Sequence, residues 1–309
     1  MSGVVDWSFP SNGDAEIDGF NNASMDTFRG QMLFSLIRET IQNSMDARVE
    51  TTAPVHVAFK LENVSKDSAT GIPELLKYLN LASETSKKQH GNKSDAFNFY
   101  QRAIEKVESK SNFPVLAIHD SNTTGLTGPI RSNSISGGTG QWLALVKGSG
   151  LSIKQSDAAL GSFGHGSKAP LSVSELRSVF YFTKIRNETG DFETRFQGKS
   201  ILQSMETNDG DMTQGTGYFG TREKLLPLLN RDIPNWPISL RKDIFEGTGT
   251  SIYIPFPDLP KDKDDLWRRV EISVLTNFCY AIVKGNLLVT INDKMISKEN
   301  VFEVLNEIL

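Results

Sequence analysis

The strongest constraint on the fold is a long amphipathic segment near the N-terminus, residues 28–48. Apolar side chains recur in it at every fourth position: Leu33, Ile37, Ile41 and Met45. At about 100° per residue, this spacing predicts a helix with one face buried against a core. A polar line runs along another side of the same helix: Glu39, Asn43 and Asp46. Such a line is a solvated face in most isolated helices, so only the rest of the chain can give it another role.

The remaining hydrophobic pattern mixes strand and helix signals. Strands are expected at 55–61, at 114–118, in a hairpin over 178–202, at 251–254 and at 286–292. Helices are expected at 72–84, at 94–108 with Ser94 or Asp95 as N-cap, after the glycines at 161–166, near 264–284 and at the C-terminal end. This order predicts an α+β sandwich, a two-layer fold in which helices pack on one face of a mixed, mostly antiparallel sheet.

The pattern divides the chain into three parts. Residues 1–27 are polar with little periodicity and are expected to form an arm or strap. Residues 28–258 form the expected main domain, with a helical insertion at about 66–112. After an acidic linker, residues 259–309 begin a C-terminal extension, and the sequence stops inside a helical pattern, which suggests a longer protein.

Composition argues against several classes of function. The formal net charge is −4 and no run of Lys and Arg resembles a basic arm, so direct nucleic-acid binding is not indicated. Cys279 is the only cysteine, which excludes an internal disulfide and a Cys-based zinc site, and the four histidines lack metal-ligand spacing. The N-terminus is too polar for a signal peptide and no apolar run reaches 18 residues, so we expect a cytoplasmic protein without a membrane segment.

A glycine-rich segment is the second candidate for a binding element. It consists of Gly161, Ser162, Phe163, Gly164, His165, Gly166, Ser167 and Lys168. The P-loop pattern G-x-x-x-x-G-K-[ST] does not fit, because Ser167 holds the lysine position and Lys168 comes one place late. Glycines before a helix let backbone N–H groups approach a phosphate, although a tight turn explains them equally well.

Two further candidates lie at strand ends. Asp120 follows the apolar run 114–118 and precedes a span rich in Gly, Ser and Thr, residues 121–150, whose length suggests a function. A carboxylate there suits an acceptor for a ligand's amino group, whereas a turn-forming Asp is the simpler explanation. Thr250 ends the sequence Gly-Thr-Gly-Thr before the strand 251–254, where β propensity alone would account for it.

These motifs gain weight from their order along the chain. They are Glu-x-x-x-Asn-x-x-Asp-Ala on a helix, Asp after a strand, Gly-x-x-Gly-x-Gly before a helix, and Gly-Thr before a strand. Over about residues 15–258 the chain resembles the GHKL ATPases. This superfamily contains the DNA gyrase B subunit, heat-shock chaperones of the ninety-kilodalton class, histidine kinases and MutL, with the MORC proteins as relatives. The resemblance implies the Bergerat fold, with ATP and Mg²⁺ as ligands.

The resemblance also implies roles for the polar line and for the strand ends. Asn43 would hold magnesium together with the phosphates, and Glu39, one helical turn earlier, would activate the attacking water. Asp46 would line the pocket or hold its wall. Asp120 would accept from the adenine amino group, with support from Thr250.

The phosphates and the edge of the pocket are assigned in the same way. The backbone of residues 161–167 would bind the phosphates, and Lys168 would neutralise their charge. Residues 126–160 would form a lid over the nucleotide. Three further residues would contact the nucleotide: Ala47, Gly125 and Leu126.

One position departs from the family pattern. The family usually has Asp-x-Gly-x-Gly after the strand, whereas this chain has Asp120-Ser-Asn-Thr-Thr-Gly125. Asn122 therefore holds the place of the first glycine. Asn tolerates left-handed backbone angles better than other non-glycine residues, so the turn is expected to form.

Glu39 favours the hydrolytic members of the superfamily. Histidine kinases generally lack a catalytic Glu there and carry an upstream phosphoacceptor His, whereas the first histidine here is His56. We therefore expect slow, magnesium-dependent ATP hydrolysis that drives a conformational switch and a nucleotide-dependent homodimer, with a protein partner reached through the C-terminal extension. The N-terminal segment GFNNASMDTFRG, followed by the run RETIQNSMDA, also resembles the sequences of ATP-binding proteins from bacterial phage-defence or DNA-processing operons. Two alternatives stay open: a chaperone-type ATPase, and a module that senses ATP without hydrolysing it and signals to a partner.

Overall fold

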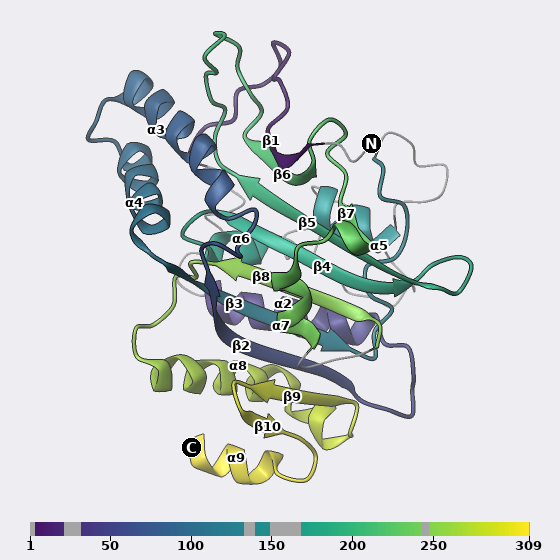
Figure 1. Cartoon of the computed structure of the whole chain (residues 1–309). Coiled ribbons are helices and arrows are strands. Elements are labelled where there is room, and N and C mark those ends of the chain that lie inside the picture. The colour runs from purple at the N-terminus through teal and green to yellow at the C-terminus, as the bar shows by residue number, and fades with distance from the viewer. Residues whose placement is uncertain (1–3, 22–31, 133–139, 149–167, 243–246, 309) are drawn as a thin grey trace.

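The computed structural model describes residues 4–21, 32–132, 140–148, 168–242 and 247–308 (Figure 1). In these residues ten strands form one sheet, in the order β1-β6-β5-β4-β8-β3-β2-β9-β10, with β7 paired to β5 off this path. The strands are β1 (Val5–Ser8), β2 (Val55–Ser65), β3 (Asn112–Ser121), β4 (Ser178–Arg186), β5 (Phe192–Ile201), β6 (Thr216–Thr221), β7 (Leu228–Leu229), β8 (Gly249–Pro255), β9 (Leu287–Ile291) and β10 (Lys294–Ile296). The pairs are antiparallel except β2 with β9, so the predicted α+β class with a mostly antiparallel sheet is confirmed.

The helices are α2 (Met32–Asp46), α3 (Leu76–His90), α4 (Asp95–Ser109), α5 (Gly140–Trp142), α6 (Ala169–Val173), α7 (Asn235–Lys242), α8 (Lys263–Val283) and α9 (Val301–Ile308). Most helices appear close to their expected positions, whereas α5 and α7 were not predicted. Ser94 is the N-cap of α4, and its side chain accepts a hydrogen bond from the backbone N–H of Phe97 at 3.3 Å. The sequence prediction of a cap at this point is therefore confirmed.

Strand β3 shows how the sheet divides the interior. Its Leu116 and Ile118 belong to a core that includes α2, α6 and α8, whereas Val115 and Ala117 belong to a second core with α3, α4 and α7. Because successive side chains of a strand point to opposite faces, helices cover both faces of the sheet (Figure 1).

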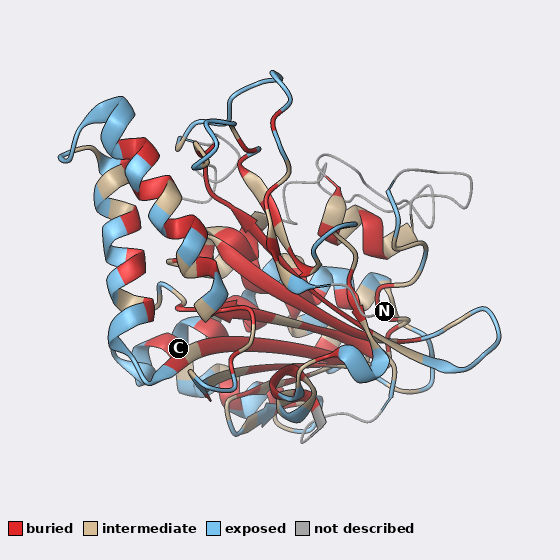
Figure 2. Cartoon of the chain, turned by 45° about the horizontal axis from the view of Figure 1, so that its top comes forward, coloured by how far each residue is buried: buried red, intermediate tan, exposed pale blue. Residues whose placement is uncertain are grey.

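The prediction that helices pack on one face only is therefore corrected. The physical reason lies in the central strands, where residues 178–183 of β4 are all buried (Figure 2). A strand with apolar side chains at consecutive positions needs cover on both sides. The helical insertion at 66–112 and α7 supply that second cover.

Both ends of the described chain join this one sheet. Strand β1 pairs with β6, and Trp7 is fully buried, with its indole Nε1 donating to the carbonyl of Gly71 at 2.5 Å. The start of the predicted arm is thus an edge strand whose tryptophan packs in the second core. At the other end, β9 pairs in parallel with β2 and α8 packs in the same core as α2, so residues 259–308 are continuous with the main core.

Candidate functional site

Three segments far apart in the sequence meet at the carboxylate of Asp120, at the end of β3. Its Oδ1 accepts from the hydroxyl of Thr123 at 2.6 Å and from the backbone N–H of Thr250 at 2.7 Å. Its Oδ2 accepts from the hydroxyl of Ser44 at 2.9 Å. Helix α2, the turn after β3 and the start of β8 therefore converge on one side chain that is only 9% exposed.

A buried arginine fixes the backbone around this carboxylate. Arg241 of α7 donates to the carbonyl oxygens of Asp120 at 2.9 Å and Thr250 at 3.1 Å, and to the hydroxyl of Ser251 at 3.0 Å. A Cβ at Gly249 would lie 2.3 Å from the Asp120 carbonyl oxygen and 2.4 Å from Nη2 of Arg241. The close approach of β8 to Asp120 therefore requires glycine at this position.

Burial and hydrogen bonding act in opposite directions on the acid. Burial raises the pKa of the Asp120 carboxyl above its ordinary value, and this is the largest effect. The Thr123 hydroxyl, the positive charge of Arg241, the Thr250 N–H and the Ser44 hydroxyl lower that pKa and offset part of the rise. The carboxylate is thus desolvated, yet held by donors that favour its charged form.

The turn after Asp120 forms as predicted despite the missing glycine. Asn122 has φ +57°, a left-handed backbone angle, which confirms the expectation from its residue type. Its amide side chain donates to the carbonyls of Glu50, Ala53 and Pro54 and accepts from the N–H of Glu50 at 2.9 Å. The asparagine therefore supplies the turn and also ties the loop after α2 to the end of β3.

The next two predicted residues pack on β4. Gly125 has φ +66°, and a Cβ there would lie 2.6 Å from the hydroxyl oxygen of Thr183. The N–H of Leu126 donates to the same hydroxyl at 2.8 Å, and that hydroxyl donates to the carbonyl of Gly249 at 2.9 Å. Gly125 and Leu126 are thus linked through Thr183 to the strand that carries Thr250.

The polar side chains in the last turns of α2 differ in burial. Ser44, next to Asn43, is buried against Asp120, whereas Asn43 and Asp46 are exposed. Asp46 accepts from the side chain of Gln42 at 2.9 Å. Among the described residues, the side chains that donate to the Asp120 carboxylate are those of Ser44 and Thr123, and Asn43 and Asp46 are not among its partners.

Two predicted residues at the ends of the polar line of α2 have defined neighbours. Glu39 is 16% exposed in its side chain, and its Oε1 forms an ion pair with Nη2 of Arg38 at 3.0 Å. At the other end of α2, the carbonyl of Ala47 accepts from the backbone N–H of Thr124 at 2.8 Å. Ala47 therefore lies against the turn that follows Asp120.

The glycine-rich segment and most of the predicted lid lie outside the described residues, so the predictions for 161–167 stay predictions. Lys168 is half-buried just before α6, and burial lowers its pKa. Within the predicted lid, residues 140–142 form α5 and Leu143–Lys147 a π-helical turn. The expectation of loop is corrected there, because Trp142, Leu143 and Val146 pack into the first core.

Sequence reasoning missed three residues that hold the site together: Ser44, Thr123 and Arg241. Ser44 directly follows the motif asparagine, and Thr123 lies within the turn already singled out, so their neighbours offered a signal. Arg241 lies 121 residues from Asp120, and no feature of the sequence near either residue pointed to their contact.

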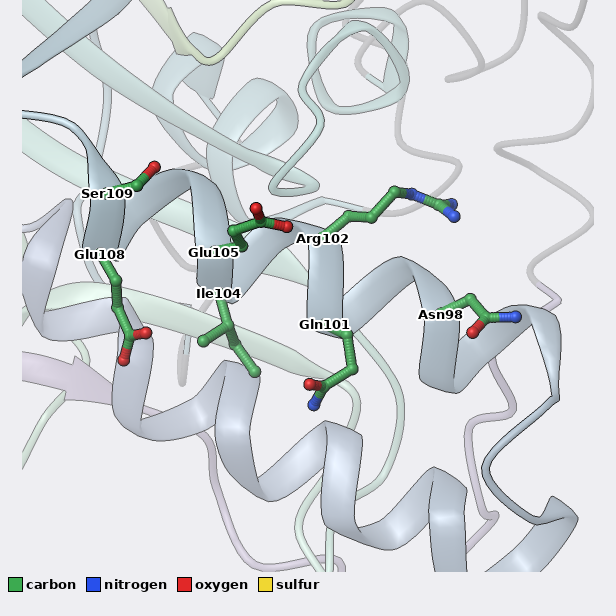
Figure 3. A pocket seen from close by; sticks show the side chains of 7 residues that line it. All are labelled: Asn98, Gln101, Arg102, Ile104, Glu105, Glu108 and Ser109. Atoms are coloured by element: carbon green, nitrogen blue, oxygen red, sulfur yellow. The ribbon is translucent and has the colours of Figure 1, made fainter.

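Metal-ligand groups and surface hollows give two further observations. In the portion of the chain that is described, no group of three or more His, Cys, Asp or Glu side chains is placed to hold a metal ion. A surface depression of about 520 Å³ runs along α4 (Figure 3). It is lined by Asn98, Gln101, Arg102, Ile104, Glu105, Glu108 and Ser109. All seven lie on α4, in the helical insertion, and none of them takes part in the Asp120 cluster.

Comparisons with known proteins leave the class open beyond the fold. No protein-family model matches the sequence, and a search of the curated proteins returns no match. Among the described helices, none combines the length and apolarity needed to cross a membrane.

Proposed function

We propose that this protein binds ATP with magnesium and hydrolyses it slowly, and that the nucleotide drives a conformational switch with dimerisation in the cytoplasm. The observation that carries the proposal is the convergence at Asp120. The motif helix α2, the end of β3 and the start of β8 contact one buried carboxylate through Ser44, Thr123 and Thr250. Three of the four motifs that suggested a GHKL-type ATPase thus meet in space.

The chemistry at Asp120 suits recognition of an amino group. A carboxylate can accept about four hydrogen bonds, and among the described residues Oδ2 receives one, from Ser44. The second lone pair of Oδ2 would accept a ligand N–H donor such as the adenine amino group. The three existing donors hold the carboxylate in one orientation, which lowers the entropic cost of binding.

The accessible part of α2 would bind the phosphate end. Asn43 is exposed, and within the described residues its side-chain amide makes no hydrogen bond, so its carbonyl oxygen is free to bind a hard cation. Mg²⁺ usually keeps several waters and binds through one or two protein oxygens plus substrate phosphates, so Asn43 needs no cluster of carboxylates around it. When bound, the metal would neutralise charge on the transferred phosphoryl group.

Glu39 is the residue assigned to the water. It lies four positions before Asn43, one helical turn away on the same side of α2, at a rise of about 6 Å. A carboxylate at that spacing would accept a proton from a water beside the phosphate that Asn43 helps to hold.

The test combines two measurements on the same variants. Binding is measured by calorimetry with a non-hydrolysable ATP analogue and Mg²⁺, and turnover by phosphate release. Glu39→Ala should keep the affinity and abolish release, whereas Asp120→Asn should lose the affinity. Glu84→Ala, at an exposed glutamate on α3, is the control and should change neither. Wild-type protein that binds no ATP would refute the proposal.

The ion pair at Glu39 favours one second candidate, an ATP sensor without turnover. Oε1 of Glu39 already forms an ion pair with Nη2 of Arg38 at 3.0 Å, so this oxygen is engaged by a protein cation before any water could donate to it. The sensor is supported if wild type binds ATP and neither wild type nor Arg38→Ala releases phosphate. Size-exclusion chromatography with and without the analogue tests the dimer for both candidates.

A further inference from the structure

A buried lysine without a hydrogen bond lies on β5, outside the Asp120 cluster. Lys199 is 3% exposed, and across the sheet its register partners are Val179 on β4 and Tyr218 on β6. No hydrogen bond or ion pair to its ammonium group exists among the described residues. Buried charges in proteins are normally paired, so this one indicates a missing anionic partner.

Two more lysines gather around it from other elements. Lys147, in the π-helical turn after α5, places its ammonium 3.4 Å from the ring centre of Tyr218 and donates to the carbonyl of Leu225 at 2.6 Å. Lys168, before α6, is near enough for its charge to act on Lys199. Lysines from three elements therefore act electrostatically on one another, Lys168 on Lys199 and Lys199 on Lys147.

The electrostatics agree with this arrangement. Burial and then the charge of Lys168 lower the pKa of Lys199 to about 8. Burial and then the charge of Lys199 lower the pKa of Lys147 to about 7. No carboxylate contributes to either shift, so mutual repulsion of the lysines adds to the cost of their burial.

Neutral polar groups next to the lysines also lack partners. Gln197 lies two residues before Lys199, on the same side of β5, and faces Tyr181 across the sheet. The hydroxyl of Tyr181 and Oε1 of Gln197 are both buried without a hydrogen bond. Buried polar atoms are seldom left unpaired, so the unpaired hydroxyl of Tyr181 and the unpaired ammonium group of Lys199 point to a ligand with acceptor oxygens, whereas Oε1 of Gln197 would need a donor such as an ammonium group.

We propose that Lys147, Lys168 and Lys199, with the hydroxyl of Tyr181, bind a phosphoryl group that carries at least two negative charges. Ammonium groups act as point charges for phosphate, and a hydroxyl donor fits the same oxygens. The lysine cluster lies on the sheet face that carries α2 and Asp120.

The phosphoryl group has two possible sources, a nucleotide or a separate phosphate compound. On β4, Thr183 pairs with Thr250 and Val179 pairs with Lys199. These two positions are four residues apart, about 13 Å along the strand. Asp120 and Lys199 lie on strands three spacings apart, about 14 Å. The inference does not rest on the proposed ATP pocket, because it concerns the phosphate and not the base.

The experiment measures binding to the full chain by calorimetry at constant ionic strength, with tripolyphosphate, ATP and chloride as probes. Wild type should bind tripolyphosphate and not chloride. Lys199→Met should weaken tripolyphosphate roughly tenfold to a hundredfold, the range expected for losing one charged hydrogen bond. Lys261→Met, at an exposed lysine, is the control of equal charge and should bind like wild type.

A stability measurement guards against a folding defect. Replacing an unpaired buried charge by an apolar side chain of similar length should leave the chain equally stable or more stable without ligand. Lys199→Met should therefore unfold at the same urea concentration as wild type or higher, and tripolyphosphate should protect only wild type. Equal tripolyphosphate affinity of both proteins, or no binding by wild type, would overturn the inference.

The results with the different probes also distinguish the two sources of the phosphoryl group, and this inference from the proposed function. If Lys199→Met weakens the binding of both ATP and tripolyphosphate, the site binds a nucleotide phosphate. If it weakens the binding of tripolyphosphate alone, the site binds a separate anion. Asp120→Asn should keep the wild-type affinity for tripolyphosphate in either case. Tripolyphosphate binding by a wild type that does not bind ATP would leave this inference standing and refute the ATP proposal.

Discussion

The hydrogen bonds at Asp120 predict that two substitutions there differ sharply in stability. In Asp120→Asn, the amide oxygen can still accept from the Thr123 hydroxyl and the Thr250 N–H. The new NH₂ group would face Ser44, whose hydroxyl could then turn its proton to the carbonyl of Thr40, 3.0 Å away, and accept from the amide. Every partner stays satisfied, so the free energy of unfolding should change by less than about 1 kcal/mol.

Asp120→Ala has no such compensation. It leaves the buried N–H of Thr250 without an acceptor, at a cost of about 1–3 kcal/mol. It also leaves the buried hydroxyl of Thr123 without its acceptor, at a similar cost of about 1–3 kcal/mol. From the two costs together, we expect a total loss of about 4 kcal/mol.

Urea unfolding followed by circular dichroism at pH 7 measures both variants. With a slope of about 3 kcal/mol per molar urea, a loss of 4 kcal/mol moves the midpoint down by about 1.3 M. The Asn variant should stay within about 0.3 M of wild type. Equal midpoints for the two variants would refute the assignment of Asp120 as the acceptor of these three bonds.

The same pair gives a pH test with a definite sign. Burial raises the pKa of Asp120 in the folded state above its unfolded value of 3.8. Stability contributed by such a group is complete below pH 3.8 and is lost as the pH rises through the folded-state pKa. Wild type should therefore lose stability relative to Asp120→Asn as the pH rises, and the opposite slope would contradict the raised pKa.

Two further substitutions test the packing around the site and at the N-terminal edge. Gly249→Ala brings a Cβ within 2.3 Å of the Asp120 carbonyl oxygen and should cost about 1–3 kcal/mol by thermal unfolding, whereas Gly247→Ala meets nothing within 4 Å and should cost less than about 0.5 kcal/mol. Trp7→Ala empties a fully buried position of β1 and should cost about 3–5 kcal/mol, against less than about 0.5 kcal/mol for Val4→Ala at a 63% exposed position. If Trp7→Ala unfolds like wild type, the edge strand contributes nothing to the core.

The sequence was sufficient for the class of fold because periodicity reports burial directly. Alternation located β2, and a continuous apolar run located β3. What covers the second face was less evident, although the run at 178–182 contained the evidence. A strand buried on both faces loses its alternation, so that run indicates a strand covered on both sides as well as one arm of a hairpin.

The candidate site divides in the same way between local and long-range causes. The left-handed turn at Asn122 depends on the residue's own backbone preference, and the sequence predicted it. The hydrogen bond from α7 to the Asp120 backbone depends on Arg241, which reaches the site only because β8 and β3 are neighbours in the sheet. No local pattern encodes such a contact, since its partners are fixed by the whole topology.

The structure gives a physical reason why two neighbouring polar residues of α2, Asn43 and Ser44, differ in burial. Adjacent helical residues point about 100° apart, so Ser44 can face the interior while Asn43 faces outward. A residue that orients a carboxylate must be buried, whereas one that binds an incoming cation must be reachable. A purely solvated face would contain no buried Ser44 bonded to an acid 76 residues away, and a purely structural one would bury Asn43 as well. Ser44 and Asn43 are thus placed as the proposed ligand-binding role of this helix requires, one to hold the acid and one to meet the ligand.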